Sequence, residues 1–284
     1  MVVLVTGAKG QLGQSIESIS INYPDIDFIF CSSSQLDITN LEHCKTIFKT
    51  YNPDYCINAA AYTAVDKAES EPEKAHLINV IGARNIAEVC TKFSTTLIHI
   101  STDFVFDGSK TTPYTEVDIT NPTGVYAQTK LDGEKAIQDT FENYFIIRTS
   151  WVYSQFGNNF MKTMLRLANE RDTLSIVSDQ IGTPTNAVDL AEVLVKIIKF
   201  CHSELVSESL FGIYNFSNEG QCSWYDFAKK IFEVNNININ LQPIPTTSFP
   251  TPAKRPAFSV LDKSKITNVF GVEVNDWKIS LKKL

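Results

Sequence analysis

The sequence lacks the features that mark membrane-spanning or secreted proteins. None of its apolar runs approaches the ~20 residues that a membrane helix needs. The N-terminal stretch has no basic segment and is too short for the apolar core of a signal peptide. No two of the six cysteines form a C-x-x-C pair, and several stand in apolar runs. Buried free thiols in a reducing compartment are therefore expected, and the predicted location is the cytoplasm.

Positive charge is also scarce. Acidic residues outnumber lysine and arginine by 32 to 25, which gives a net charge of -7 at pH 7. Nucleic acids and anionic membranes require a basic face, so neither is expected as a partner. A local basic pocket for a phosphorylated ligand remains compatible with this balance. The four histidines show no H-x-x-x-H or carboxylate arrangement, and no metal ligand is predicted from them.

The sequence does contain an alternation of strand-like and helix-like segments. This alternation predicts an α/β fold with right-handed crossovers, that is, a Rossmann-type doubly wound parallel sheet. Ligands of such sheets bind beyond the C-terminal ends of the strands. The predicted strands are 2–6, 26–31, 55–58, 95–101 and 144–148, and the predicted helices are 11–21, 41–51, 73–93 and 124–141.

The second half of the chain is less regular. We expect residues 1–150 to form a dinucleotide-binding domain and 151–284 to form mainly a smaller C-terminal substrate lobe. A helical segment at 186–200 and a strand-like one at 212–216 are expected to pack back onto the first domain. Further helices are predicted at 158–171 and 223–234. Five prolines predict an ordered loop or linker over 243–256, and the serine-rich residues 201–209 predict a surface excursion.

A glycine-rich turn follows the first predicted strand. Gly7, Gly10 and Gly13 are spaced G-x-x-G-x-x-G between that strand and the first helix. Gly7 allows the tight turn, Gly10 lets backbone N–H groups approach a pyrophosphate, and Gly13 lets the helix pack close to the strand. The helix N-terminus adds free N–H donors and a partial positive charge. This context predicts a nucleotide site, with a purely structural turn as the alternative.

The end of the second predicted strand bears on the choice of cofactor. Sites that prefer NAD usually have an acid there, which binds the ribose 2′-hydroxyl. Here the strand ends in Cys31, Ser32, Ser33 and Ser34, without a carboxylate. The serine hydroxyls can donate to a 2′-phosphate, and Lys9 could either supply compensating charge or merely be solvated. We therefore expect NADPH, with tolerance of NADH left open.

Tyr126 and Lys130 are the candidates for proton transfer. They stand four residues apart at the start of a predicted helix and so share one face. A free phenol has a pKa of ~10, and a nearby ammonium is expected to lower it. Such a pair also occurs by chance on amphipathic helices, but here it follows a nucleotide-binding turn. Thr102, at the end of the fourth strand, could hydrogen-bond a substrate carbonyl or the hydroxyl that it becomes.

Together these motifs resemble the extended short-chain dehydrogenase/reductases. Further segments narrow the resemblance to the dTDP-4-dehydrorhamnose reductase family, in family order and nearly end to end. Ala127 departs from the glycine that usually follows the tyrosine in that family, a small change that should fit. The matching segments are 58–69, 101–108, 148–153, 158–160, 179–185 and 250–256.

The resemblance implies reduction of the 4-keto group of dTDP-4-dehydro-L-rhamnose to dTDP-L-rhamnose. Hydride would come from C4 of the nicotinamide. Tyr126 would give the proton, Lys130 would hold Tyr126 and the ribose, and Thr102 would orient the keto oxygen. The predicted cofactor-binding residues, from the turn and the resemblance together, are Gly7, Gly10, Gln11, Leu12, Gly13, Asp37, Ile38, Ala61, Tyr62, Thr63, Tyr126 and Lys130. The implied substrate-binding residues are Thr102, Asp103 and Trp151.

Several of these residues have a structural alternative. Asp37 could cap the following helix, and Trp151 could be a core aromatic. Arg255 could contact nucleotide phosphates or pair with a surface carboxylate, while His99 is expected to be a core residue. Asp66 and Glu69 could form a solvated helix face. Some relatives form Mg-linked dimers through surface glutamates, but no motif here predicts a metal ligand, so Mg and a homodimer are left open.

Two other functions compete with reduction. A sugar-nucleotide epimerase or dehydratase of the same superfamily would keep its NAD and regenerate it in each cycle. A non-catalytic subunit, similar to the regulatory subunit of methionine adenosyltransferase, would use the same kind of fold for binding alone. The presence of Tyr126, Lys130 and Thr102 favours an enzyme.

Overall fold

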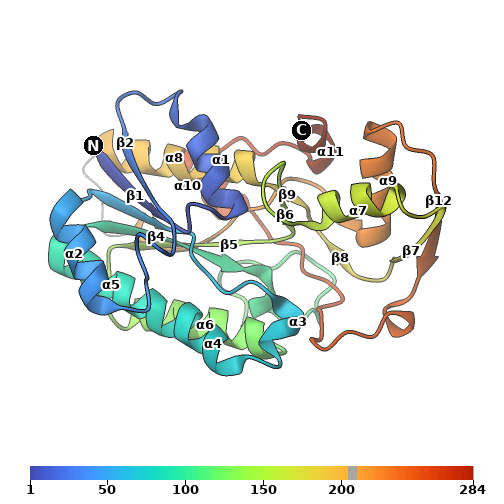
Figure 1. Ribbon diagram of the computed structural model, residues 1–284, viewed down its shortest axis with the longest axis horizontal. Helices are drawn as coiled ribbons and strands as arrows, with labels where there is room; N and C mark the ends of the chain where they lie inside the picture. The colour runs from blue at the N-terminus through green and yellow to red at the C-terminus, as the bar shows by residue number, and fades with distance from the viewer. Residues whose placement is uncertain (204–209, 284) are drawn as a thin grey trace.

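A six-stranded parallel sheet forms the centre of the protein (Figure 1). The computed structural model describes residues 1–203 and 210–283, so the predicted surface excursion at 201–209 lies largely outside the described residues. The strand order is β2-β1-β3-β4-β5-β10, and every neighbouring pair is parallel. The strands are β1 (Val2–Thr6), β2 (Asp27–Cys31), β3 (Tyr55–Asn58), β4 (Thr96–Thr102), β5 (Tyr144–Thr149) and β10 (Gly212–Asn215).

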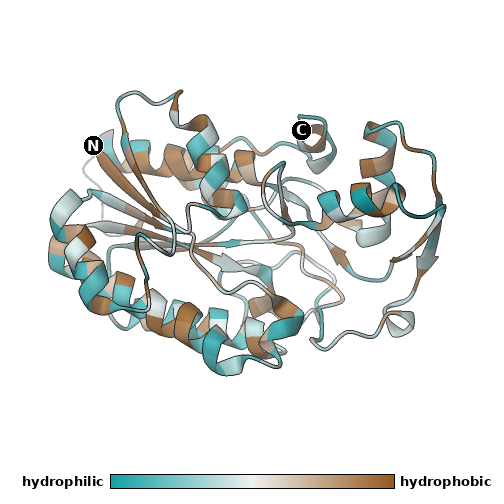
Figure 2. Cartoon of the chain, viewed as in Figure 1, coloured by the Kyte–Doolittle hydropathy of each residue, from teal (hydrophilic) through white to brown (hydrophobic). Residues whose placement is uncertain are grey.

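Helices cover both faces of this sheet, which confirms the predicted doubly wound α/β fold. Apolar residues of the helices and strands form one core on each face. Figure 2 shows the largely hydrophobic strands enclosed between helices that carry hydrophilic residues outward. One face is covered by α1 (Gln11–Ser20), α8 (Ala187–Ser203) and α10 (Ser264–Phe270), and the other by α2 (Leu41–Tyr51), α5 (Gly82–Phe93) and α6 (Val125–Gln138).

Local sequence explains where many of these elements begin and end. Helix α2 begins at Asn40, whose side chain accepts the backbone N–H of His43 at 3.1 Å. It ends at Asn52, which adopts a left-handed conformation just before Pro53. The six cysteines are all buried and unpaired, as predicted. Within residues 1–203 and 210–283, none of the helices combines the length and apolar character that crossing a bilayer requires.

The helix predicted over 73–93 is three segments in the structure. Helix α4 (Pro72–His76) leads into a π-helical turn, η1 (Leu77–Ile81), which continues into α5. Helix α6 crosses at this turn so closely that a Cβ on Gly133 would lie 2.2 Å from the Asn79 carbonyl oxygen. An extra residue in one turn is invisible to apolar periodicity, because the flanking segments keep their helical spacing.

The C-terminal lobe stands beside the sheet with its own apolar core, which includes Tyr153, Phe227 and Trp277. Its helices are α7 (Phe160–Ala168), α9 (Trp224–Val234) and α11 (Trp277–Leu281). Its short strands are β6 (Val152–Tyr153) paired with β9 (Thr185–Asn186), β8 (Ile181–Gly182) paired with β11 (Cys222–Ser223), and β7 (Thr173–Val177) paired with β12 (Asn240–Ile244). Strand β10 belongs to the main sheet, where it pairs with β5, and helix α8 packs beside α1 on one face of that sheet. The division of the chain at residue 150 stays a prediction.

The predicted loop over 243–256 is wrong at its start. Strand β12 contains Pro243, which is aligned with Ile176 of β7 in a parallel pair. This two-stranded sheet consists of edge strands only, and an edge position tolerates a residue that has no backbone N–H. A short 3-10 turn, η4 (Thr246–Ser248), follows the strand.

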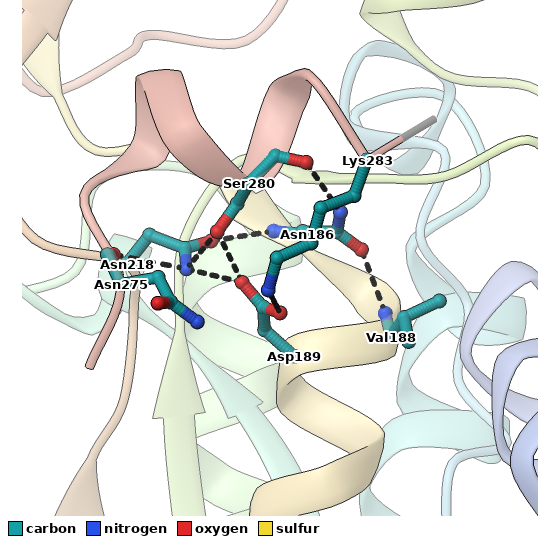
Figure 3. Close-up of polar contacts among 7 residues, drawn as sticks. All are labelled: Asn186, Val188, Asp189, Asn218, Asn275, Ser280 and Lys283. Atoms are coloured by element: carbon teal, nitrogen blue, oxygen red, sulfur yellow. Dashed lines mark hydrogen bonds and ion pairs between the residues drawn. The ribbon is translucent and has the colours of Figure 1, made fainter. Parts of the chain in front are cut away.

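A polar network fastens the end of the chain to the main domain (Figure 3). The Asp189 carboxylate of α8 accepts hydrogen bonds from Asn218 at 2.7 Å and from Ser280 of α11, and it pairs with Lys283 at 2.9 Å. Asn186 donates to the Ser280 carbonyl at 3.0 Å. Helix α11 is therefore held at the N-terminal end of α8 through one largely buried carboxylate.

Asp189→Ala is expected to lower the free energy of unfolding by about 1–3 kcal/mol, because the buried Ser280 hydroxyl would lose its acceptor and Asn218 would lose one of its acceptors. Chemical denaturation measures this loss. Asp172→Ala, which removes an exposed carboxylate outside the network, is the matched control and should change stability little. Equal effects of the two substitutions would contradict the role given to the network.

Candidate active site

A cleft of about 510 Å³ lies at the C-terminal ends of β1, β3, β4 and β5. The sheet order reverses between β1 and β3, and this is where open parallel sheets bind their ligands. One wall comes from the main domain, and the other from Trp151, Phe160 and Trp224 of the lobe. The cleft brings together Gly10, Gln11, Leu12, Gly13, Ala61, Thr63, Thr102, Asp103, Tyr126, Lys130 and Trp151, all predicted from the sequence.

The glycine-rich turn forms the floor of one end of the cleft. Gly7 has a φ of 66°, and a Cβ there would lie 2.8 Å from backbone atoms of Ala59. A Cβ on Gly13 would lie 2.6 Å from the Cα of Ala8 and from the carbonyl oxygen of Gly7. Gly10 begins α1 without any side-chain cap among the described residues. The first N–H groups of α1 therefore face the cleft at the positive end of a helix, which suits a pyrophosphate.

The end of β2 offers hydroxyl groups in place of a carboxylate. The Ser32 and Ser34 hydroxyls lie 2.9 Å apart, and Ser32 also donates to the Gln35 side chain at 2.7 Å. Lys9 is exposed on the neighbouring turn. These groups suit a ribose that carries a 2′-phosphate, because residues 31–34 at the strand end are a cysteine and three serines, without a carboxylate.

Four predicted cofactor residues lie outside the cleft wall. Gly7 lies beneath it, and Ile38 is buried against Gly82 of α5. Asp37 is exposed and accepts hydrogen bonds from Thr39, and because Asn40 caps α2, the alternative that Asp37 caps this helix is wrong. Tyr62 is buried, with its hydroxyl 2.9 Å from Glu71 and its backbone N–H on the side chain of Asn79. Their contacts with a cofactor remain predictions.

Tyr126 and Lys130 lie on the face of α6 that meets the cleft. Helix α6 begins just before them because the Glu69 carboxylate, from the end of the short helix α3 (Val65–Ala68), accepts the Val125 N–H at 2.8 Å. Glu69 is therefore not part of a solvated face. The Tyr126 phenol and the Thr102 hydroxyl line the same cleft, and Phe104, in the 3-10 turn η2 (Asp103–Val105), packs edge-on against the Tyr126 ring.

The lysine does not lower the phenol pKa as predicted. The Lys130 ammonium donates to the Ile100 carbonyl at 2.7 Å and lies 3.2 Å from Nε2 of His99, so its hydrogen bonds go to β4. Burial raises the pKa of Tyr126 to about 12, and the Asp103 charge adds to this shift. Burial also lowers the pKa of Lys130 to about 8. A neutral phenol at pH 7 is arranged to give a proton rather than to take one.

His99 is a core residue, as expected. It is buried in β4, and its Nδ1 lies 3.0 Å from the Asn58 side chain. Burial and the Lys130 charge hold the pKa of His99 well below its usual range, which keeps the ring neutral. The His99 ring therefore links β3 with β4 and contacts the Lys130 ammonium through Nε2.

Asp103 is the buried acid of the site. Its side chain is 2% exposed, and Oδ1 accepts the Thr102 hydroxyl at 3.0 Å. Among the described residues, Oδ2 has no hydrogen-bond partner. Burial raises the pKa of Asp103 to about 7, although the Ser259 and Thr102 hydroxyls oppose the shift.

The raised pKa of Asp103 predicts a stability difference that depends on pH. The unfolded carboxyl ionises near its usual pKa of ~3.9, so folding is penalised increasingly as pH rises from about 4 to about 7 and fully above that. Asp103→Asn is neutral at every pH and escapes this penalty. Its Tm relative to the wild type should therefore rise between about pH 4 and pH 8. Thermal unfolding across this range measures it, and a constant difference would contradict the buried, titrating acid.

Trp151 belongs to both an aromatic cluster and the cleft wall. It adopts a φ of 46°, unusual for a bulky residue, and stacks on Trp224 with ring centroids 3.5 Å apart. A Cβ on Gly182 would lie 2.6 Å from its ring, so this glycine makes room for it. Sequence reasoning missed Trp224 and Phe160, because no motif connects helices of the lobe with the ends of the main sheet.

Arg255 closes one end of the cleft and pairs with Asp66. Its guanidinium lies 2.7 Å from Oδ2 and 3.0 Å from Oδ1 of that carboxylate in α3. Of the two sequence interpretations, pairing with a carboxylate is therefore the one that the structure shows. Within the described part of the chain, no group of three or more histidine, cysteine, aspartate or glutamate side chains could hold a metal ion.

Comparisons with known proteins agree with this geometry. The family model described as the RmlD substrate binding domain matches residues 1–284. A dTDP-4-dehydrorhamnose reductase of Aggregatibacter actinomycetemcomitans is 42% identical over 289 residues, which cover 99% of this chain and 97% of that protein.

Solved structures give the same result. A dTDP-4-dehydrorhamnose reductase of Clostridium acetobutylicum superposes with a TM-score of 0.93 at 41% identity, covering 100% of this chain and 98% of the other. The corresponding enzyme of Bacillus anthracis, in complex with NADP, superposes with a TM-score of 0.92 at 40% identity, covering 99% and 97%. The chain therefore belongs to the dTDP-4-dehydrorhamnose reductase family, as its motifs predicted.

Proposed function

We propose that this protein reduces the 4-keto group of dTDP-4-dehydro-L-rhamnose to dTDP-L-rhamnose, with NADPH as the reductant. The observation that carries the proposal is that Tyr126, Thr102 and Lys130 line one cleft that begins at the glycine-rich turn. The family relatives bear the name of this activity, and the Bacillus anthracis relative binds NADP.

The residues of the cleft fit a reduced dinucleotide, which supplies the hydride when bound. Gly10 and Gly13 leave space that a Cβ would restrict, and the first N–H groups of α1 would hold the pyrophosphate. The hydroxyls of Ser32 and Ser34 would meet a 2′-phosphate. Lys130 would hold the nicotinamide ribose through its ammonium group.

Proton transfer follows from the contacts around the phenol. Thr102 and Tyr126 would both hydrogen-bond the keto oxygen of the sugar, which fixes its orientation. As negative charge develops on that oxygen, Tyr126 gives it the phenolic proton. Asp103 and Trp151 would contact the sugar from the two walls of the cleft.

The phenol also distinguishes reduction from the competing functions. An epimerase or dehydratase begins by removing a proton from a sugar hydroxyl or carbon, which requires a phenolate. A pKa of about 12 keeps Tyr126 protonated and favours the donor role. A binding subunit would need neither a buried lysine nor a phenol in the cleft.

Turnover with a defined sugar tests the proposal. dTDP-4-dehydro-L-rhamnose, made in situ, is supplied with NADPH, and nicotinamide absorbance is followed together with the product. We expect NADPH consumption equal to the dTDP-L-rhamnose formed. Copurified NAD that is not consumed while a sugar is isomerised would support the epimerase. Consumption with another 4-keto nucleotide sugar alone would change the substrate and keep the chemistry.

We also propose a location, a domain division and a cofactor preference for this protein. We place the protein in the cytoplasm, and we divide it at residue 150 into a cofactor domain and a mainly substrate-binding lobe. A homodimer and a role for Mg stay open. NADH is expected to serve less well than NADPH, because no carboxylate at the end of β2 receives the 2′-hydroxyl.

A further inference from the structure

An ion pair is buried directly behind the catalytic face of α6. The Glu134 carboxylate accepts Nη2 of Arg148 at 2.7 Å and Nε at 3.0 Å. The Ser101 hydroxyl donates to the same carboxylate. Glu134 and Arg148 are 1% and 3% exposed. The pair therefore lies in the interior of the domain, where charges are rare.

The Glu134–Arg148 pair lies next to the residues that are proposed to carry out the reaction. Tyr126, Lys130 and Glu134 follow each other at four-residue intervals and so lie along one face of α6. Ser101 and Arg148 are partners in the β4–β5 register, and the next pair in that register is Thr102 with Thr149. The Glu134 carboxylate thus joins the helix to both strands at the level just below Thr102.

Stability alone gives a poor reason for this arrangement. Burying two charges has a large desolvation cost that their attraction repays only in part, and well-packed apolar residues often replace such a pair without loss of stability. Here the pair is not even fully satisfied, because Nη1 of Arg148 has no hydrogen-bond partner among the described residues. Its guanidinium lies instead 5.2 Å from the centre of the Phe106 ring.

We propose that Glu134, with Arg148 and Ser101, is a positioning residue for the reaction: it fixes α6 on the ends of β4 and β5 so that Tyr126 and Lys130 face the cleft at Thr102. The inference rests on the proposed function for its catalytic consequence. Directional hydrogen bonds from two strands to one carboxylate set the rotation and height of the helix more sharply than apolar packing does.

The carboxylate has a second consequence for Lys130. The titratable groups that act on this ammonium are His99 from β4, whose Nε2 lies 3.2 Å away, and Glu134 from α6. Burial lowers the pKa of Lys130, and Glu134 is the group that opposes this shift. Glu134 therefore helps to keep the lysine charged where it would hold the ribose.

A double substitution separates positioning from stability. Glu134→Met with Arg148→Met removes both charges and keeps side chains of similar length. We expect a folded protein with an unchanged or higher Tm, a KM for the sugar within about threefold of wild type, and a kcat about 10²-fold lower. Lys110→Met with Asp118→Leu removes another ion pair, 2.7 Å apart and outside the cleft, and should leave kcat unchanged.

The charge of Lys130 can be read without any sugar. Lysine labelled with ¹³C at Cε is titrated by NMR, and the Lys130 resonance is assigned from its absence in Lys130→Met. Glu134→Gln should lower the pKa of Lys130 by about one unit or more, since it removes the anion and leaves the Arg148 cation.

These two measurements decide the inference separately from the proposed function. Wild-type kcat in the folded double variant, or an unchanged Lys130 pKa in Glu134→Gln, would overturn it. A double variant that fails to fold would assign the pair to stability and would overturn it as well. A wild-type protein without turnover, but with the expected Lys130 shift, would refute the substrate and retain Glu134 as the residue that controls this lysine.

Discussion

Tyr126→Phe is expected to lower kcat for the 4-keto sugar by about 10²–10⁴-fold, the usual contribution of a general acid. The substitution removes the proton that the alkoxide would receive and keeps the ring that packs against Phe104. Affinity for NADPH should change little, because the glycine-rich turn and Lys130 remain. Steady-state kinetics give kcat, and fluorescence titration with NADPH gives the affinity.

A matched control removes another tyrosine hydroxyl. The Tyr153 hydroxyl is buried in the lobe and has no hydrogen-bond partner within the described residues. Tyr153→Phe should therefore keep both turnover and cofactor affinity. If Tyr126→Phe turned over like this control, the phenol would not be the proton donor.

Gly13→Ala is expected to weaken NADPH binding by up to about 10²-fold. The new Cβ would lie 2.6 Å from the Cα of Ala8 and the carbonyl oxygen of Gly7, which are backbone atoms and cannot move aside cheaply. To relieve this clash, α1 would have to shift away from β1. The N–H groups at the start of α1 would then move away from the pyrophosphate. Overpacking of this kind costs about 1–3 kcal/mol, which corresponds to a roughly 5- to 150-fold change in affinity when it falls on the bound state.

Gly220→Ala distinguishes loss of the cofactor site from general strain. Gly220 has a φ of 85°, and its Cβ would lie 3.1 Å from Asp276 and Trp277 of the lobe rather than against the glycine-rich turn. This variant should lose some stability and keep wild-type affinity for NADPH. Equal affinities of the two variants would show that the contact of α1 with β1 does not set the phosphate site.

The sequence predicted well those elements whose signals are local. Helix α2 and strands β1 and β3 have the predicted bounds, because caps, a following proline and short buried runs lie within the segments themselves. The extra turn at η1 and the strand at Pro243 were missed, because both depend on what packs beside them. The π-helical turn η1 lies where α6 crosses it, and Pro243 is tolerated because its strand lies at an edge.

The sequence predicted only those site residues whose signals are local. The glycine-rich turn, Tyr126 and Lys130 form motifs of short spacing, and the cleft brings them together. Trp224 and Glu134 had no motif, since their importance arises from contacts across β-strands and between the domain and the lobe. The direction of the Tyr126 shift was wrong because burial outweighs the neighbouring ammonium, and burial cannot be read from spacing.

The most direct test of the central claim is transfer of an isotope. NADPH carrying deuterium at the transferring position of nicotinamide C4 is supplied with dTDP-4-dehydro-L-rhamnose, and the product is analysed by mass spectrometry and NMR. We expect dTDP-L-rhamnose with one deuterium, located at C4 of the sugar. A product without deuterium, formed while the labelled NADPH remains intact, would contradict it.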